Sequence, residues 1–208
     1  MLVQITEGSL AYAEDNLLLS NINLTLFSRE RVAILGDNGT GKSTLVKAIL
    51  SDESLKKTGS WILPKDAYVG YVDQHYQHLF DGKTVLDMLS VFMPQAGYKE
   101  LRSHLNTFLF RKNEEVEILV ANLSGGEKAR LSLCCIAAET PALLILDEIT
   151  NNLDLEARDH LIQVLKAYPG AIMVISHDRD FLKAIQIDKV YLIRQGTIEW
   201  LPSLEVIQ

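Results

Sequence analysis

The sequence has few of the features that mark secreted, membrane-spanning or nucleic-acid-coating proteins. Only two residues are cysteine, and Cys134 and Cys135 are adjacent in an apolar run, which predicts packed thiols in a reducing cytoplasm. No stretch approaches the roughly 18 consecutive apolar residues of a membrane-spanning helix, and the start MLVQITEGSL lacks the pattern of a signal peptide. A net charge of −7 argues against a surface that binds nucleic acid throughout, while a local basic patch is compatible with it. We therefore expect a cytoplasmic protein without a membrane span.

The composition is that of an ordinary globular protein. The 208 residues are 48% hydrophobic and 23% charged, which is enough to bury a sizeable core in one domain with a small subdomain. The sequence contains no internal repeat and no low-complexity tract. The length therefore predicts a single domain over residues 1–208.

Three regions differ in their hydrophobic pattern. Residues 1–35 contain short β-branched runs, residues 84–121 have helical periodicity, and residues 141–200 alternate between apolar strands and helices. This alternation predicts an α/β fold with a largely parallel sheet covered on both faces, closed by a hairpin at Gly196.

The helical region is predicted to be an insert in the α/β core. Leu101, Leu105, Phe108 and Leu109 have the spacing of one helix face. We therefore expect a helical subdomain over residues 81–122, with the core formed by residues 1–80 and 123–208.

A glycine-rich turn follows the first of the strongly apolar strands. The sequence RVAILGDNGTGKSTLV places an apolar strand before Gly36-x-x-x-x-Gly41-Lys42-Ser43 and a helix after it, which is the context of a phosphate-binding loop. In such a loop, backbone N–H groups surround the phosphates, Lys42 reaches the β- and γ-phosphates, and Ser43 ligates Mg²⁺. The alternative is a glycine-rich turn with a chance lysine. The expected phosphate-binding residues are Gly36, Asp37, Asn38, Gly39, Thr40, Gly41, Lys42, Ser43 and Thr44.

Two carboxylates follow a second apolar strand, LLILDE. Because ligands bind beyond the carboxyl ends of parallel strands, Asp147 is placed to hold Mg²⁺ and Glu148 to orient and deprotonate a water. The alternative is a solvated acidic turn.

The stretch LSGGEKARL has two interpretations. Ser124 and Glu127 have the spacing of a capping box at the start of a helix, which is a purely structural role. A capping box does not require Gly125 and Gly126, however, and their missing side chains allow an anion to approach the helix closely.

Six motifs taken in order, GDNGTGKS, YVDQ, LSGGE, LLILDE, NNLD and SHD, resemble the motif set of ATP-binding cassette (ABC) domains. The resemblance covers essentially the whole chain. It implies the P-loop NTPase fold of an ABC nucleotide-binding domain, with an N-terminal antiparallel part, a mostly parallel core and a small helical subdomain. It also implies Mg²⁺-dependent ATP hydrolysis by two cassettes that sit head to tail with two ATP molecules between them.

The resemblance also implies roles for individual residues. Tyr12 is expected to stack on adenine, Gln74 to contact Mg²⁺ and the attacking water, and His177 to touch the γ-phosphate. Ser124 and Gly126 are expected to contact the ATP of the partner cassette, and Asp154 to cross the interface. Alternatively, Tyr12 is a surface aromatic, His177 is structural, and His75 and His78 form a metal-binding pair.

Two details resemble the F-type subfamily, whose members lack transmembrane partners. The signature continues as SGGEKARL, and the compact insert contains RSHLNTFLF, which is similar to the F-type helical arm. The chain most resembles the second cassette of such a protein. This implies a second cassette and the ribosome or its RNA as partners, with a role in translation or in protection from ribosome-targeting antibiotics.

The sequence departs from the family pattern at two positions near Asp154. Family members usually read DEPTNHLD, whereas this chain has Ile149 in place of the proline and Asn152 in place of the histidine. Neither change removes a phosphate or Mg²⁺ ligand, so the departures bear on turnover and signalling across the interface. Two other functions stay open: the ATPase subunit of a membrane transporter, and a nucleotide-gated clamp that hardly turns over.

Overall fold

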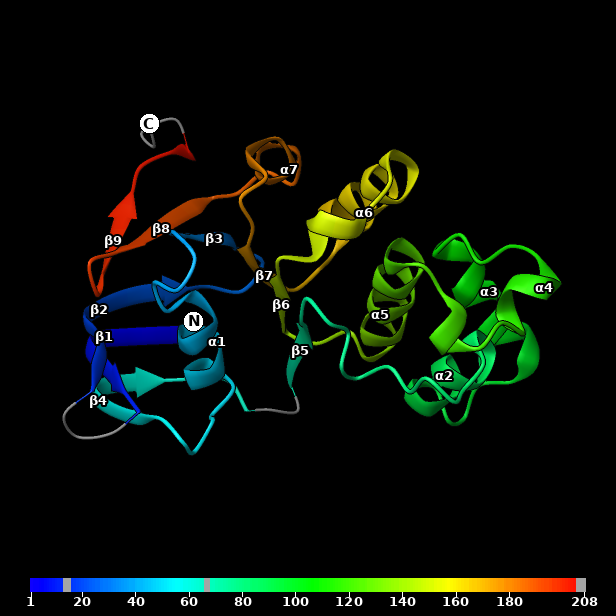
Figure 1. Ribbon diagram of the computed structural model, residues 1–208, viewed down its shortest axis with the longest axis horizontal. Helices are drawn as coiled ribbons and strands as arrows, with labels where there is room; N and C mark the ends of the chain where they lie inside the picture. Colours follow the sequence, from blue (N-terminus) through cyan, green and yellow to red (C-terminus); the bar gives the residue numbers. More distant parts are fainter. Residues whose placement is uncertain (13–15, 66–67, 205–208) are drawn as a thin grey trace.

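Nine strands form one mixed sheet in residues 1–12, 16–65 and 68–204, which are the residues that the computed structural model describes (Figure 1). The strand order is β4-β1-β2-β9-β8-β3-β7-β6-β5. The strands are β1 (Val3–Ala11), β2 (Leu17–Leu26), β3 (Arg31–Leu35), β4 (Lys56–Ile62), β5 (Val69–Val72), β6 (Leu143–Asp147), β7 (Ala171–Ile175), β8 (Lys189–Arg194) and β9 (Thr197–Leu201).

The sheet has an antiparallel part and a parallel part. β1 pairs antiparallel with both β2 and β4, whereas β3, β5, β6, β7 and β8 run parallel to their neighbours among these strands. β8 and β9 form the hairpin predicted at Gly196, which has a positive φ of 72°. The predicted fold class, with an antiparallel N-terminal part and a mostly parallel core, is confirmed.

Helices lie on the sheet and form a lobe beside it. They are α1 (Lys42–Ile49), α2 (Val85–Phe92), α3 (Tyr98–Thr107), α4 (Asn113–Val116), α5 (Gly125–Glu139), α6 (Leu155–Ala167) and α7 (Arg179–Ala184), with 3₁₀ turns η2 (Val120–Asn122) and η3 (Ile149–Asn152). In Figure 1, α2, α3, α4 and α5 gather at the end of the molecule away from β1, β2 and β4. None of the helices in the described ranges is long and apolar enough to cross a membrane.

The central strands are buried on both faces, as their continuous apolar runs predict. In β3, Val32 and Ile34 pack in a hydrophobic cluster that includes α1, whereas Ala33 and Leu35 pack in a second cluster that includes α5 and α7. This alternation follows from the two-residue period of a strand. The two clusters therefore fix β3 from both sides and hold its carboxyl end in place.

The helical periodicity of residues 84–121 belongs to several short helices. α3 buries Leu101 and Leu105, as predicted, but the helix ends at Thr107. Phe108 is still buried, whereas Leu109 has φ of +67° and lies in the turn after the helix. The expectation that all four apolar residues share one helix face is therefore wrong for Phe108, which is the C-cap residue, and for Leu109, because hydrophobic spacing alone does not show where a helix ends.

Helix α5 contacts the helices α2 and α3 as well as the sheet. It packs against α2 and α3 on one side and contacts β5 and α6 on the other. A β-carbon built on Gly70 of β5 would lie 2.4 Å from Ile136 Cγ2 and 2.7 Å from Pro141 Cγ. The missing side chain of Gly70 thus lets α5 lie close against the edge of the sheet. The division into a core and a subdomain at residues 81–122 stays a prediction.

We expect Gly70→Ala to lower the free energy of unfolding by about 1–3 kcal/mol, because the added methyl overlaps α5 and the residues that follow it. Urea denaturation measures this change. Gly82→Ala is the matched control, since a β-carbon at Gly82 meets nothing within 4 Å. Equal midpoints for the two variants would contradict the close packing of α5 on β5.

Candidate functional site

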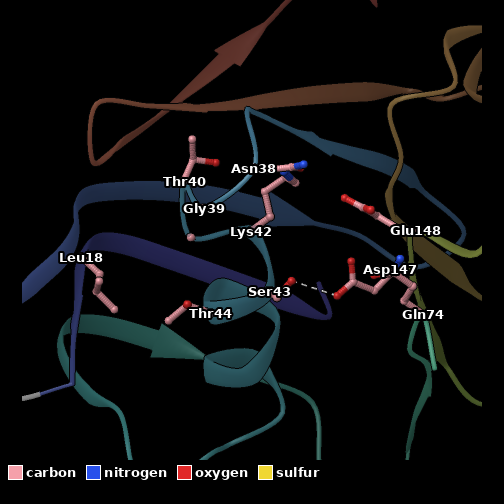
Figure 2. Close-up of a pocket in the computed structure, with 11 residues that line it drawn as sticks. Leu18, Asn38, Gly39, Thr40, Lys42, Ser43, Thr44, Gln74, Asp147 and Glu148 are labelled. Carbon is pink, nitrogen blue, oxygen red and sulfur yellow. Dashed lines mark hydrogen bonds between the residues drawn. The ribbon is translucent and has the colours of Figure 1, made fainter. Parts of the chain in front are cut away.

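A cavity of about 450 Å³ opens at the carboxyl edge of the parallel strands (Figure 2). The residues that line it come from four separate segments, which the sheet topology brings to one edge. They are Leu18, Asn38, Gly39, Thr40, Gly41, Lys42, Ser43, Thr44, Gln74, Asp147 and Glu148. Most of the predicted phosphate-binding residues and both predicted carboxylates are therefore brought together.

The loop between β3 and α1 needs glycine at two turns. Gly36 has φ of 147°, and a β-carbon there would lie 2.5 Å from the Ile193 carbonyl oxygen. Gly41 has φ of 104° and immediately precedes the first residue of α1. Side chains other than glycine are strained at such angles, so the two glycines allow the loop to curve over the start of α1.

Lys42 is buried at the base of this loop. Its Nζ donates hydrogen bonds to the carbonyl oxygens of Gly36 (2.7 Å) and Asp37 (2.9 Å). Its side chain lines the cavity in Figure 2. The ammonium group therefore holds the loop in its closed shape. The lysine and the N-terminus of α1 both supply positive charge to the cavity that the loop surrounds.

Asp147 is the last residue of β6, and its carboxylate contacts residues of both α1 and β5. Its Oδ2 accepts hydrogen bonds from Ser43 Oγ (3.1 Å) and from the Tyr71 hydroxyl (3.3 Å). Burial raises the pKa of Asp147, and these two hydrogen bonds oppose the rise. Burial also raises the pKa of Tyr71, so its hydroxyl stays protonated and remains a donor.

The chemistry of this corner fits a small divalent cation. Ser43, Gln74 and Asp147 offer hydroxyl, amide and carboxylate oxygens at one side of the cavity, and Mg²⁺ prefers oxygen ligands. A bound cation would supply the positive charge that favours the ionised form of the buried Asp147. No cluster of three or more His, Cys, Asp or Glu residues with metal-binding geometry occurs in residues 1–12, 16–65 and 68–204.

Glu148 lies next to Asp147 and faces a histidine from the neighbouring strand end. Its Oε1 is 3.6 Å from His177 Nε2, and its backbone N–H donates to the Ile175 carbonyl. Glu148 has φ of 52°, which is uncommon for a residue other than glycine. Backbone strain of this kind persists only where the surrounding structure maintains it, and it is frequent at functional sites.

His177 lines a second cavity, of about 410 Å³, together with Gly36 and Asp37 of the glycine-rich loop. The segment that carries it is braced from two sides. Arg158 of α6 makes hydrogen bonds to both carboxylate oxygens of Asp178 at 2.9–3.2 Å. The buried Ser176 hydroxyl accepts from Asp178 N and contacts Thr150 Oγ1 at 3.1 Å. His177 is therefore an exposed side chain on a firmly held segment.

The Ser124 segment does not line the cavity. Ser124 Oγ accepts from Glu127 N (3.3 Å), and Glu127 Oε2 accepts from Ser124 N (2.8 Å), so the predicted capping box is present. Ser124 is exposed, and α5 lies apart from α1 in Figure 1. Within one chain, Ser124, Gly125 and Gly126 therefore have no contact with the loop around Lys42.

Two other predicted residues also lie outside the lining of the cavity. Asp154 is exposed and caps α6, with Oδ1 accepting from Ala157 N at 2.8 Å. Tyr12 follows β1 and is 45% exposed, and residues 13–15 beside it lie outside the described part of the chain. Ile149 is 2% exposed and packs in the core at the start of η3, whereas the side chain of Asn152 lies outside the described residues.

Two residues at the cavity were not predicted from the sequence. Leu18 of β2 lines it, and Tyr71 of β5 donates to Asp147. Tyr71 belongs to the YVDQ stretch, so its place two residues before Asp73 was the available signal. For Leu18 no signal distinguishes it from the other apolar residues of its strand.

Comparison with known proteins supports one assignment. A family model described as ABC transporter matches residues 19–151, which is more than half of the chain. The chain belongs to the ABC family. Membership implies ATP binding and ATP hydrolysis, and ABC domains generally pair with a second cassette.

The curated relatives of this cassette include proteins of the F type. It is 37% identical to the probable ATP-binding protein YheS of Escherichia coli K12 over 95% of the chain and 31% of that protein. It is 30% identical to Protein GCN20 of Saccharomyces cerevisiae, covering 95% of the chain and 26% of that protein. It is 34% identical to ABC transporter F family member 5 of Arabidopsis thaliana, covering 89% and 27%. The cassette thus spans less than a third of each of these relatives.

A solved structure shows the same fold. The cassette superposes on a bacterial Atm1-family ABC exporter with ATP bound at a TM-score of 0.79 and 21% identity, covering 95% of the cassette and 38% of that chain. At this identity the likeness establishes the ABC ATPase fold and no more.

We expect Lys42→Ala to weaken ATP binding by about tenfold or more, because a charge-assisted hydrogen bond to a phosphate is lost. Isothermal titration with Mg·ATP measures the affinity. Lys47→Ala on the exposed face of the same helix removes an equal charge and is the matched control. An equal loss of affinity in both variants would show a general electrostatic effect instead of a specific contact.

Proposed function

We propose that the chain is an ATP-hydrolysing cassette of the F type that closes with a second cassette, head to tail, around two Mg·ATP. The observation that carries this proposal is the separation of two sets of residues. The phosphate-binding loop, Asp147 and Glu148 share one cavity, whereas Ser124 is exposed elsewhere with its hydroxyl at the start of a helix. A partner cassette can bring its own Ser124 to this cavity.

Each part of the cavity has a proposed role. The loop residues Gly36, Asp37, Asn38, Gly39, Thr40 and Gly41 surround the phosphates through their backbone, and Thr44 lies on the first turn of the helix that follows. Lys42 leaves the two loop carbonyls to contact the β- and γ-phosphates. Ser43, Gln74 and Asp147 would hold Mg²⁺, which supplies charge neutralisation between the phosphates. Tyr12 stacks on adenine, a role supported only by the family resemblance.

Glu148 is the proposed general base. Its side chain lines the cavity, and His177 lies 3.6 Å from it on a braced segment. Glu148 accepts a proton from the attacking water, while His177 and Gln74 orient that water against the γ-phosphate. These three residues come from the ends of different strands, so the sheet register determines their spacing.

The second half of each site comes from the partner. Ser124, Gly125 and Gly126 of the partner would contact the γ-phosphate, with the helix N-terminus adding favourable charge. Asp154 would cross the interface. In a pair of identical cassettes the same residues build both sites. Closure and reopening then form the mechanical output.

The proposed target of this output is the ribosome, in translation or in protection from antibiotics. The support for this target is the resemblance of the sequence motifs to the F-type subfamily. The proposal includes a cytoplasmic location and a division of the chain into a core (1–80 and 123–208) and a helical subdomain (81–122), which is supported by the packing of α2 and α3 together.

We expect Glu148→Gln to slow ATP hydrolysis by about 10²–10⁴-fold while ATP still binds, because the general base is lost and the phosphate contacts are kept. Phosphate release and Mg·ATP titration measure the two properties. Glu199→Gln, which makes the same change on exposed β9, is the matched control. Hydrolysis at the wild-type rate would refute the assignment of the base. A wild-type chain that binds ATP and leaves it intact through a single-turnover experiment would instead be a clamp.

We expect the mass of the Glu148→Gln variant, measured by light scattering, to double when Mg·ATP is added. The same variant with Ser124→Ala should bind ATP and stay monomeric. The reason is that Ser124 contacts the partner's nucleotide. Thr84→Ala is the matched control, because Thr84 Oγ1 caps α2 by accepting from Asp87 N and its loss also weakens a helix start.

Equal loss of pairing in Ser124→Ala and Thr84→Ala would show that helix stability, not contact with nucleotide, controls association. A Glu148→Gln variant that stays monomeric at saturating ATP would contradict pairing between two copies of this chain.

A further inference from the structure

The segment that follows Gln74 is closed into a compact turn. Asp73 accepts hydrogen bonds from the backbone N–H groups of His75 (2.7 Å) and Gln77 (3.0 Å). The turn continues with a hydrogen bond from Leu79 N to the Tyr76 carbonyl, and both of these side chains are buried. Gln74 therefore cannot shift far without moving the residues that follow it.

One of those residues makes a partly buried hydrogen bond to another part of the fold. His78 Nε2 lies 2.9 Å from the hydroxyl of Ser132, which is fully buried in α5. The His78 ring meets Phe92 of α2 edge to face, and its Nδ1 is buried with no hydrogen-bond partner in the described part of the chain. The bond to Ser132 is thus the polar contact that orients this ring.

Burial of the imidazole favours its neutral form. Burial lowers the pKa of His78, and the nearby charge of Asp73 opposes this only in part. Ser132 lies among the buried apolar residues Leu131 and Leu133. A buried hydroxyl without a partner is unfavourable, so the pair is favoured over separation of its members.

Ser132 belongs to the helix that presents Ser124. Eight residues separate the two, which is about 12 Å along a rigid helix. A chain of close contacts therefore runs from Gln74 at the cavity, through the Asp73 turn and His78, to α5 and its exposed N-terminus.

We propose that His78 is a positioning residue that couples Gln74 to α5 through its hydrogen bond to Ser132. This inference rests on the proposed function. A shift of Gln74 would then be passed to α5 and would change the position in which Ser124 could meet the partner's nucleotide. His78 touches neither nucleotide nor metal in this role.

Hydrogen exchange of the α5 amides, with and without Mg·ATP, tests the coupling in the full chain. The Glu148→Gln background prevents hydrolysis, and a concentration at which light scattering shows a monomer excludes effects of pairing. The variants are Ser132→Ala and His78→Phe, which keeps the ring against Phe92 and removes the nitrogens. The matched control is His104→Phe, because His104 Nε2 also contacts α5, at the Cys134 carbonyl (2.9 Å), but from α3.

We expect Mg·ATP to change exchange in α5 of the parent and of His104→Phe, and to leave α5 unchanged in Ser132→Ala and His78→Phe. The double variant should lose no more than either single one. With Glu148 restored, kcat should fall by about two- to tenfold in the two test variants, the effect of one net hydrogen bond, with KM unchanged. His78→Gln, which keeps an amide group that can donate or accept near the place of Nε2, should recover part of the response.

Three results would overturn the coupling: an α5 response that survives in Ser132→Ala, an equal loss in His104→Phe, or a parent that binds Mg·ATP without any response in α5. In the last case the proposed function would stand and only the coupling would fail. A parent that does not bind Mg·ATP would refute both.

Discussion

The hydrogen bond between Ser43 and Asp147 connects the phosphate-binding loop to the acidic end of β6. The positions of the other residues of the site depend on the parallel sheet that brings these two residues together. Ser43 is the second residue of α1, after the glycine loop, and Asp147 ends β6. β3 and β6 both pair in parallel with β7, so their carboxyl ends meet at one edge. Because the central strands are packed on both faces, a change in register would move Asp147 away from the loop.

Much of this edge could be predicted from the sequence because local chemistry determines it. The loop glycines, Lys42 and the acidic pair each follow an apolar strand, and parallel strands place such residues together. The capping box at Ser124 is similarly local, since all of its atoms lie within four residues. What the pattern could not decide was whether Ser124 also has a second function, because that depends on a molecule outside the chain.

The contacts that the sequence does not predict are those made between distant segments. Tyr71 reaches Asp147, and His78 reaches Ser132, across 76 and 54 residues respectively. Nothing in the spacing of His75 and His78 distinguishes a metal pair from a histidine that bonds a buried serine. Likewise, the apolar stripe that includes Leu109 predicts burial without showing that α3 has already ended.

The distant contact between His78 and Ser132 joins the segment after β5 to α5. α5 packs against the helices α2 and α3 but also touches β5, where Gly70 leaves room for it. The turn that follows Gln74 connects β5 to the lobe, and its His78 makes a hydrogen bond to Ser132 of α5. The segment after Gln74 is thus joined to α5 by a partly buried hydrogen bond, whereas Ser124 and Asp154 are exposed. If the proposed coupling holds, the sheet fixes the phosphate-binding loop while α5 carries Ser124, so a change at Gln74 has a path to the residue that the proposal assigns to the partner's nucleotide.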